Sequence, residues 1–555
     1  MSMLKITVDG KPYKIQKWQS IKQFIETNFE KEKKSIYACY INNDPVSLNF
    51  KVTSDDLDVQ LIRHSDEIGK IIYRKSLCFL LHRVIFELFR NSRIVQGTAL
   101  GDTYYYDFYT DIPVTENLLR QIALKMREYI KKEEEFEHFT FSKKQAIEYF
   151  EKRGFYNKAK LIEQMNKEYI AVYSSGPYKD IDFSPLLPDA GYIKDFWLKK
   201  YDKGFLLCFS GKANKNELLI QIGKREKLFK TFIESKKWGR IIEVNNVRRL
   251  NDIILHNKTQ EVVNICESLH EKKIAQIADE IKNEYDKRKI RLILIAGPSS
   301  SGKTTFTKRL AIHLKINGLN PIFISLDNYY IDREKTPKDE NGNYDFENIM
   351  ALDIKLLNEH LTELIDGNEI EAPLYDFEIG KRKEKGITLR IDEYQPIIIE
   401  GIHGLNPLLT KKIDDNLKFK IYVSALTPIA IDDYNRIPSS DNRLLRRIVR
   451  DYKYRNYNAA ETIKQWPSVR KGEEKYIFPY QENADVFFNS AHHFELSVLK
   501  EEAEKYLNEV PWGSEEYKVA YRLLNFLSIF KPIDRKYIPA NSILREFIGG
   551  SCFKY

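Results

Sequence analysis

Apolar and polar residues alternate at the start of the chain and then change to a helical spacing. Residues 5–8 alternate, and the Asp9-Gly10 pair behind them is typical of a hairpin turn. Ser20 can then cap a helix, because apolar residues recur at helical spacing after it. Strand-like segments follow at 37–41 and 57–62. A hairpin, a helix and further strands in this order predict a small β-grasp fold.

The next part of the chain mixes helical and strand-like patterns. Residues 73–89 and 116–132 predict helices, and 102–107 predicts an aromatic strand between them. Residues 229–289 predict one or two helices that lead into another domain. No internal repeat or long Pro/Gly linker separates these segments, so we expect the domains to pack directly on one another.

A continuous apolar run at 290–296 predicts a strand that is buried on both faces of a parallel sheet. The residues after it match G-x-x-x-x-G-K-[ST] without departure, and an apolar stripe from Phe306 predicts a helix behind them. The predicted nucleotide-binding residues are Gly297, Pro298, Ser299, Ser300, Ser301, Gly302, Lys303, Thr304 and Thr305.

Each part of this loop has a physical role toward a nucleotide. Its backbone N–H groups point at the β-phosphate, and the helix N-terminus adds partial positive charge. Lys303 can bridge β- and γ-phosphate oxygens, and Thr304 can hold Mg²⁺. ATP and Mg²⁺ are therefore expected.

Two carboxylates follow the next buried strands. Asp327 comes just after a strand at 321–326, whose C-terminal end lies on the phosphate side of the sheet. It can accept a proton from an acceptor hydroxyl, organise Mg²⁺ through water, or only cap a turn. Glu400 follows an apolar run at 396–399, as a Walker-B-type acid or an ordinary strand-end carboxylate.

The segment DNRLLRRIVRD predicts a capped helix with arginines on one face. Arg443, Arg447 and Arg450 are spaced i, i+4 and i+7, so one face presents three guanidinium groups. Such a helix can serve as a lid that neutralises charge on a transferred phosphoryl group. The alternative is a surface helix whose arginines pair with Asp441 and Asp451.

Composition limits the classes of protein that fit. A chain of 555 residues predicts about three or four domains. No apolar run approaches the roughly 20 residues of a membrane helix, so no membrane partner is expected. The start of the sequence shows no signal peptide, which predicts a cytoplasmic protein. The five cysteines lack a C-x-x-C pair, which predicts reduced thiols. The net charge of +9 permits phosphate or RNA ligands without demanding them.

Several motifs follow the loop in a fixed order. They are SLDNYY at 325–330, YDFENIMALD at 344–353, PLYDF at 373–377, IIIEGI at 397–402 and the arginine segment at 441–451. With the phosphate loop, this series resembles the uridine kinase and phosphoribulokinase family over residues 289–498. The resemblance implies transfer of phosphate from ATP to a nucleoside 5′-hydroxyl.

The same resemblance implies roles for particular side chains. Asp327 is expected to be the general base, Asp345 to bind the ribose hydroxyl, and Glu400 to act beside Mg²⁺. The expected walls of the base pocket are Tyr330, Tyr375 and Phe377. The expected cations around the phosphoryl group are Lys303, Arg447, Arg450 and Arg455.

Two positions depart from the family pattern. Gly380 stands where uridine-cytidine kinases carry a His that binds the pyrimidine edge, and Tyr457 replaces a second lid arginine. Loss of a hydrogen bond to the base relaxes discrimination between similar ligands. The base preference is therefore open.

The front half resembles other families. Residues 1–66 resemble a TGS domain, and 67–235 resemble the editing-type domain of threonyl-tRNA synthetases, from YRKSLCFLL through DTYYYDF to YKDIDFSPL. The three His and one Cys of that family's editing centre are replaced by Lys75, Phe79, Asp182 and Leu186. Without imidazole or thiolate we expect a retained structural or regulatory scaffold, and RNA binding stays open but is not expected.

The chain ends with a sequence, IPANSILREFIGGS at 538–551, that is similar to the end of long bacterial nucleoside kinases. It predicts a short helix at 542–547, ended by Gly549-Gly550. Arg545 and Glu546 either close over the active site or pair with each other, and the second is expected.

These patterns predict a multidomain protein of α/β and α+β class. The expected order is a TGS-like β-grasp domain (1–66), an α+β editing-like domain (67–235), a helical connector (236–288), a P-loop domain with a parallel sheet covered by helices on both faces (289–498) and a helical extension (499–555). The expected protein is a homo-oligomeric nucleoside kinase. Three alternatives stay open: a kinase of another small alcohol such as a phosphorylated sugar, an RNA-associated P-loop regulator, and a dead nucleotide-binding scaffold, against which the intact loop argues.

Overall fold

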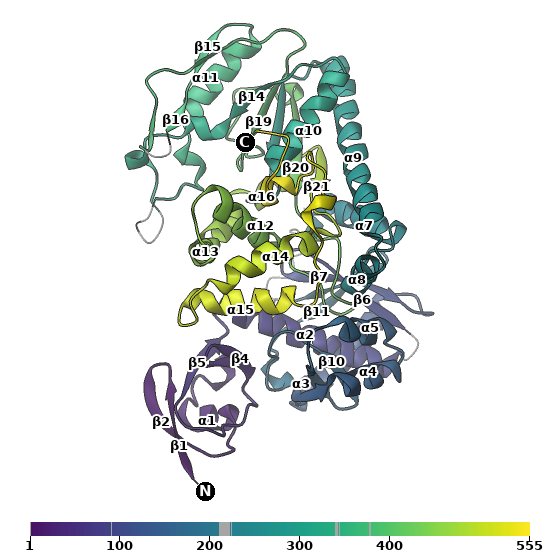
Figure 1. The fold of residues 1–555 in the computed structure, drawn as a ribbon. Helices are drawn as coiled ribbons and strands as arrows, with labels where there is room; N and C mark the ends of the chain where they lie inside the picture. Colours follow the sequence, from purple (N-terminus) through teal and green to yellow (C-terminus); the bar gives the residue numbers. More distant parts are fainter. Residues whose placement is uncertain are drawn as a thin grey trace.

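The structure, a computed structural model, describes residues 2–89, 92–209, 222–223, 225–338, 342, 344–376 and 379–554. The N-terminus lies at one end of the molecule, and the C-terminus lies beside a parallel sheet at the other end (Figure 1). None of the helices in these ranges combines the length and the apolar character that crossing a membrane requires.

The first residues fold as the predicted β-grasp module. A five-stranded sheet in the order β2-β1-β5-β3-β4 packs against one helix. Ser20 caps this helix by accepting a hydrogen bond from the Gln23 N–H, and the Gln23 side chain returns the bond. The elements are β1 (Met3–Val8), β2 (Lys11–Gln16), α1 (Ile21–Asn28), β3 (Ile36–Ile41), β4 (Asp44–Ser47) and β5 (Leu57–Arg63).

An α+β unit with two sheets follows. Helix α2 (Glu67–Leu88) is apolar nearly all round because it contributes to a core shared with both sheets and α3. One sheet has the order β11-β12-β7-β6 and the other β10-β9-β8. The remaining elements are β6 (Arg93–Ala99), β7 (Thr103–Tyr109), α3 (Glu116–Lys131), β8 (Glu137–Ser142), α4 (Lys143–Glu151), α5 (Tyr156–Gln164), β9 (Tyr169–Ser175), β10 (Tyr178–Ile181), β11 (Trp197–Tyr201) and β12 (Gly204–Cys208).

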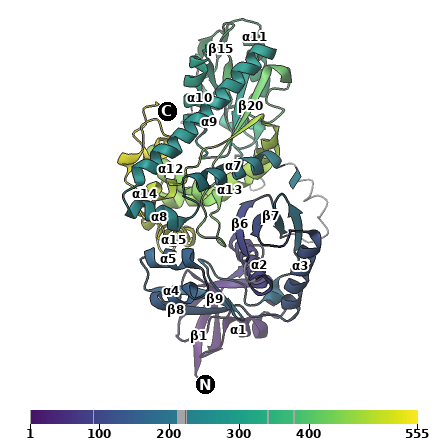
Figure 2. The same ribbon diagram turned by 90° about the vertical axis from the view of Figure 1, so that its right-hand side faces the viewer.

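Three helices connect this unit to the parallel sheet. They are α7 (Glu226–Ile241), α8 (Val247–Leu255) and α9 (Thr259–Arg288). Helix α9 runs along one side of the P-loop domain, as Figure 2 shows, and buries its apolar stripe against α10 (Lys303–Ile316). It ends where Lys289 adopts a left-handed conformation (φ 56°) immediately before the central strand.

The P-loop domain has the predicted parallel sheet, in the order β14-β19-β13-β20-β21. Alternate residues of the central strand enter different cores: Ile293 and Ile295 join the core of α10, and Leu292 and Leu294 join the core of α11. The strand is therefore buried on both faces, as predicted. The elements are β13 (Leu292–Ala296), β14 (Ile322–Ser325), α11 (Ile354–Ile365), β15 (Ile370–Ala372), β16 (Tyr375–Asp376), β17 (Lys381–Arg382), β18 (Ile387–Leu389), β19 (Ile397–Glu400), β20 (Lys418–Ser424) and β21 (Val486–Asn489).

The last helices pack on the same core as α10. They are α12 (Ser439–Tyr454), α13 (Ala459–Tyr476), α14 (Glu495–Asn508), α15 (Glu515–Leu527) and α16 (Arg545–Ile548). Helix α7 continues across the expected boundary at 235/236, and α14 across that at 498/499. The terminal helix is shorter than predicted, because residues 542–544 form turns before it.

The cysteines of the described ranges are free, and four of them are buried while Cys552 is exposed.

A buried ion cluster joins the editing-like unit to the P-loop domain. Lys158 on α5 contacts Asp180 on β10 and lies 3.5 Å from Asp432 in the segment after β20. The Lys158 and Asp432 side chains are each 4% exposed. Removal of the ammonium would leave two buried carboxylates without their cation.

We therefore expect Lys158→Ala to lower the free energy of unfolding by about 3–5 kcal/mol, measured as an earlier thermal transition. Lys160→Ala is the matched control, since Lys160 on the same helix is exposed and pairs with Glu163. Equal melting of the two variants would show that the cluster contributes no stability.

Candidate active site

The loop between β13 and α10 has the backbone of a phosphate-binding loop. Ser300 (φ 57°) and Gly302 (φ 80°) adopt left-handed conformations, which turn successive N–H groups toward one concavity. Gly297 approaches β20 so closely that an added Cβ would lie 2.1 Å from the Val423 carbonyl oxygen. The sequence therefore needs glycine at this position for packing.

Two buried arginines of α12 hold this loop from behind. Arg443 donates to the Ser299 carbonyl (3.2 Å) and Arg446 donates to the Ser300 carbonyl (3.3 Å). Each guanidinium pairs with a buried glutamate, Arg443 with Glu473 and Arg446 with Glu495. The prediction that Arg443 shares a cationic face with Arg447 and Arg450 is therefore wrong for Arg443, which is committed to Glu473. The alternative of a surface helix is wrong in its exposure, because α12 is buried, and in its pairing with Asp441, which binds Arg522, but its pairing of arginines with Asp451 is confirmed.

The other predicted cations gather around one carboxylate. Arg447 donates to Asp451 (3.0 Å) and to the Ser299 hydroxyl (2.9 Å). Arg450 also pairs with Asp451 at 3.0 Å, and Arg455, which is 52% exposed, lies 3.7 Å from it. Burial, with the neighbouring Arg450, lowers the pKa of Arg447 and of Arg455, although Asp451 opposes this. This crowding of cations favours an anionic ligand beside Ser299.

The predicted metal-side pair is in contact. Thr304 donates from its hydroxyl to the Glu400 carboxylate at 3.1 Å, and the Lys303 ammonium donates to the Pro298 carbonyl at 3.3 Å. Burial, with neighbouring Glu546 and Asp327, raises the pKa of Glu400, although Lys303 opposes this. Glu400 is thus influenced by two other carboxylates, although the three are not arranged as a metal-binding group.

Asp327 lies in a short 3-10 turn (Leu326–Tyr329) directly after β14. Its N–H donates to the Ser325 hydroxyl at 3.3 Å, so the turn is held from its own strand end. The carboxylate is accessible to solvent, yet the surrounding protein partly desolvates it and raises its pKa, while Lys303 and Arg455 act in the opposite direction. An accessible but crowded carboxylate is suited to receive a proton from a ligand bound beside it.

Aromatic residues lie beside Asp327. The Tyr330 ring lies 5.8 Å from Tyr375, and the Tyr330 hydroxyl donates to the Phe346 carbonyl at 3.1 Å. Phe377, the third predicted wall residue, lies outside the described residues. Asp345 accepts a hydrogen bond from the Tyr476 hydroxyl at 2.9 Å. Helix α13 therefore holds one oxygen of Asp345, the carboxylate that was predicted to bind the ribose hydroxyl.

Glu347, two residues beyond Asp345, is a candidate site residue that was not predicted. Burial, with the neighbouring Glu473, raises the pKa of Glu347 to about 7, while Arg447 and Lys303 act in the opposite direction. This second carboxylate therefore faces the cations of the phosphate loop and α12. The only signal in the sequence was its place inside the YDFENIMALD motif.

Gly380 is fixed by its backbone. It has φ +75°, and an added Cβ would lie 2.7 Å from Nε of Arg333. The Arg333 N–H also donates to the Gly380 carbonyl at 2.9 Å. Arg333 therefore covers the place where the family pattern has a His side chain.

The C-terminal segment reaches the phosphate loop. The Glu546 carboxylate accepts from the Thr305 N–H (3.2 Å) and from the Thr305 hydroxyl (2.7 Å). Arg545 instead donates to backbone carbonyls, among them those of Pro539 and Gly549. The expected pairing of Arg545 with Glu546 is therefore wrong. Sequence separation hid the contact, because Thr305 and Glu546 are 241 residues apart.

The replaced editing positions form no comparable site. Lys75 pairs with Asp182 at 2.5 Å, and Phe79 and Leu186 are buried in the apolar core. Among the described residues, no group of three or more His, Cys, Asp or Glu is arranged to hold a metal ion. An ion pair and apolar packing have taken the place of the imidazole and thiolate groups.

Known proteins resemble the two halves separately. The model of the phosphoribulokinase / uridine kinase family matches residues 292–497. A uridine kinase of Clostridium botulinum (strain Langeland) is 32% identical over 208 residues, which are 37% of this chain and 91% of that kinase. A uridine kinase of Bacillus subtilis is 31% identical over 196 residues, 35% of this chain and 83% of that kinase.

A threonine–tRNA ligase of Wolbachia pipientis is 29% identical over 251 residues, which are 43% of this chain and 39% of that ligase. This similarity fits the TGS-like and editing-like front half. Among solved structures, a possible uridine kinase from Bacillus stearothermophilus is 20% identical and covers 36% of this chain and 89% of its own, with a TM-score of 0.25. By its phosphate loop, its parallel sheet and its match to nearly the whole length of uridine kinases, the chain belongs to the phosphoribulokinase / uridine kinase family.

Proposed function

We propose that the protein transfers the γ-phosphoryl group of ATP to the 5′-hydroxyl of a nucleoside, with Mg²⁺, to give the nucleoside monophosphate. The observation that carries this proposal is the position of Asp327, which is influenced by Lys303 of the phosphate loop and lies close to Tyr330, the neighbour of Tyr375. A kinase needs a binding site for the phosphate donor and one for the acceptor, because phosphoryl transfer depends on positioning the two in line.

On the ATP side, the N–H groups of residues 297–305 would hold the phosphates, and Lys303 would bridge the β- and γ-oxygens. Arg447 and Arg450 would stabilise the charge that spreads over the transferred group, and Arg455 would close the exposed side. Asp451 fixes the orientation of the first two guanidiniums before ATP arrives. Little reorganisation is then needed in the transition state.

The donor set fits Mg²⁺ held partly by the substrate. The Thr304 hydroxyl and the Glu400 carboxylate would hold it together with phosphate oxygens and water. When bound, Mg²⁺ neutralises charge on the β- and γ-phosphates. The carboxylates that raise the pKa of Glu400 explain why a cation is favoured at this place.

On the acceptor side, we assign two carboxylates to the ribose and one to the proton. Asp327 would accept the 5′-hydroxyl proton, so the oxygen could attack the γ-phosphorus as ADP leaves. Asp345 and Glu347 would accept hydrogen bonds from the ribose hydroxyls, and Tyr330 and Tyr375 would contact the base. Gly380 supplies no side chain to the base edge, which supports a broader base range than uridine and cytidine alone.

The remaining parts of the proposal concern organisation. We propose a cytoplasmic homo-oligomer in which the TGS-like (1–66), editing-like (67–235) and connector (236–288) regions support the P-loop domain (289–498) and its extension (499–555). The Lys75–Asp182 pair in the former editing position supports a scaffold role rather than editing chemistry.

ADP release with a panel of nucleosides and ribulose 5-phosphate tests the function. Turnover is expected with one or more nucleosides, and Asp327→Asn is expected to lower kcat by about 10²–10⁴-fold because the base is lost. Activity should also fall as the pH is lowered through the pKa of Asp327, which is raised above its usual value, since only the ionised carboxylate accepts the proton. Asp332→Asn is the matched control, because Asp332 pairs with Lys335 at the surface of the same segment. Turnover with ribulose 5-phosphate alone would reject the nucleoside.

Glu347→Gln is expected to raise the nucleoside KM by about tenfold, because a charge-assisted hydrogen bond is lost. Since the pKa of Glu347 is about 7, the wild-type nucleoside KM should fall as the carboxylate ionises between about pH 6 and about pH 8. The same pH series on the variant should be flat. An unchanged slope in the variant would show that Glu347 does not bind the nucleoside.

Glu546→Gln is expected to lower the KM for ATP by about fivefold, because ATP phosphates then displace a neutral amide instead of a carboxylate from Thr305. Glu515→Gln on the exposed face of α15 is the control. A raised KM for ATP in the Glu546 variant would indicate that the carboxylate stays in place and supports nucleotide binding.

A further inference from the structure

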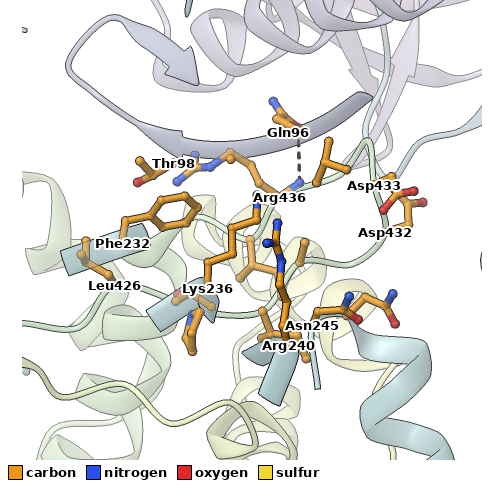
Figure 3. Close-up of a pocket in the computed structure, with 18 of the residues that line it drawn as sticks. Gln96, Thr98, Phe232, Lys236, Arg240, Asn245, Leu426, Asp432, Asp433 and Arg436 are labelled. Carbon is orange, nitrogen blue, oxygen red and sulfur yellow. Dashed lines mark hydrogen bonds between the residues drawn. The ribbon is translucent and has the colours of Figure 1, made fainter. Parts of the chain in front are cut away.

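A second pocket lies where the editing-like unit meets the P-loop domain (Figure 3). Its walls come from β6, from α7 and from the 426–439 segment that joins β20 to α12. No residue of the phosphate loop lines it. Its volume of about 90 Å³ holds several water molecules or one phosphate group.

Four cationic side chains line this pocket: Arg93, Lys236, Arg240 and Arg436. Figure 3 shows Lys236 and Arg240 extending from one helix toward the strand that carries Gln96. Two of the four are paired: Arg93 donates twice to Asp433, at 2.7 Å each, and Lys236 contacts Asp107.

The other two guanidiniums lack such partners. Arg240 donates to the Tyr109 hydroxyl at 2.7 Å, and the Arg436 guanidinium lies 5.0 Å from the centre of the Tyr104 ring. None of the ion pairs formed by the described residues includes Arg240 or Arg436. The pocket therefore carries more positive than negative charge.

The behaviour of Lys236 supports this charge balance. Burial, with Arg240 and Arg93 nearby, lowers the pKa of Lys236 to about 8, even though Asp107 contacts its ammonium. Repulsion among these cations would be relieved by an anion in the pocket.

We propose that this pocket is an anion site, separate from the ATP site, that binds the phosphate group of a small phosphorylated metabolite. Guanidinium groups present planar pairs of donors that match phosphate oxygens, and two of them face this cavity without a carboxylate. Phe232 and Tyr109 on the walls are placed to contact the organic part of such a ligand.

The site has a direct connection to the proposed catalytic arginines. The 426–439 segment is tied to β6 by the Gln96 N–H, which donates to the Asp433 carbonyl at 2.8 Å. At its other end, Pro438 is the N-cap of α12, the helix of Arg447 and Arg450. An anion on Arg436 therefore contacts the segment that sets the start of α12, so occupancy should change phosphoryl transfer. The expected effect on turnover rests on the proposed kinase function, whereas binding of an anion in this pocket does not.

Titration calorimetry of the full chain with inorganic pyrophosphate tests the site. In a Lys303→Ala background, which weakens the phosphate loop, one binding event should remain. Adding Arg240→Gln should weaken it at least tenfold, since a charge-assisted contact is lost. Arg240 is exposed, so this change leaves the fold intact. Lys230→Gln is the matched control, because Lys230 lies on the same helix and pairs with Glu226 outside the pocket.

Parallel titrations with inorganic phosphate and with a sugar phosphate distinguish the free ion from a phosphorylated metabolite, whose binding should be tighter and should weaken with Arg240→Gln. No binding in the Lys303→Ala protein, or binding that Arg240→Gln leaves unchanged, would overturn the site. Pyrophosphate that binds through Arg240 without altering ADP release by the wild-type chain would overturn its connection to α12.

Discussion

Two buried ion pairs, Arg443 with Glu473 and Arg446 with Glu495, fix the phosphate loop. Their side chains are at most 4% exposed, and both arginines donate to loop carbonyls. Removing one partner of such a pair leaves an uncompensated buried charge and costs about 3–5 kcal/mol. The loop conformation therefore depends on α12 and on the helices that supply its glutamates, not on the sequence motif alone.

This arrangement divides the arginines of α12 into two kinds. Arg443 and Arg446 pair with buried glutamates, whereas Arg447 and Arg450 pair with Asp451, and Arg447 also donates to the Ser299 hydroxyl. The loop's donors are also held by the protein's own carboxylates, with Glu473 accepting from the Ser299 N–H at 3.1 Å and Glu546 accepting from Thr305. A nucleotide would thus exchange with carboxylates rather than with water.

Local patterns were sufficient to predict the β-grasp module, the parallel sheet and the residues of the phosphate loop, because each depends on periodicity or on a short motif. Contacts between distant segments were not predictable in this way. The spacing of Arg443 places it beside Arg447 on the helix, but Glu473 on another helix decides its role. The sequence allows Glu546 to close over the active site, but its contact with Thr305 and the position of Glu347 come from tertiary packing.

The front half of the chain also contacts the P-loop domain through charged and hydrogen-bonded groups. Within this half, Lys75 pairs with Asp182, while the β6 strand holds the segment that leads into α12. Under the proposed function, the front half acts as a scaffold that sets the start of the arginine helix.

The most direct measurement is phosphorus NMR of the reaction with ATP, Mg²⁺ and the nucleoside that gives the highest turnover. The account predicts a new phosphomonoester signal split into a triplet by the two 5′-protons of the nucleoside, with ADP formed in equal amount. Inorganic phosphate as the sole new product, or a monoester coupled to a different set of protons, would contradict transfer to the 5′-hydroxyl.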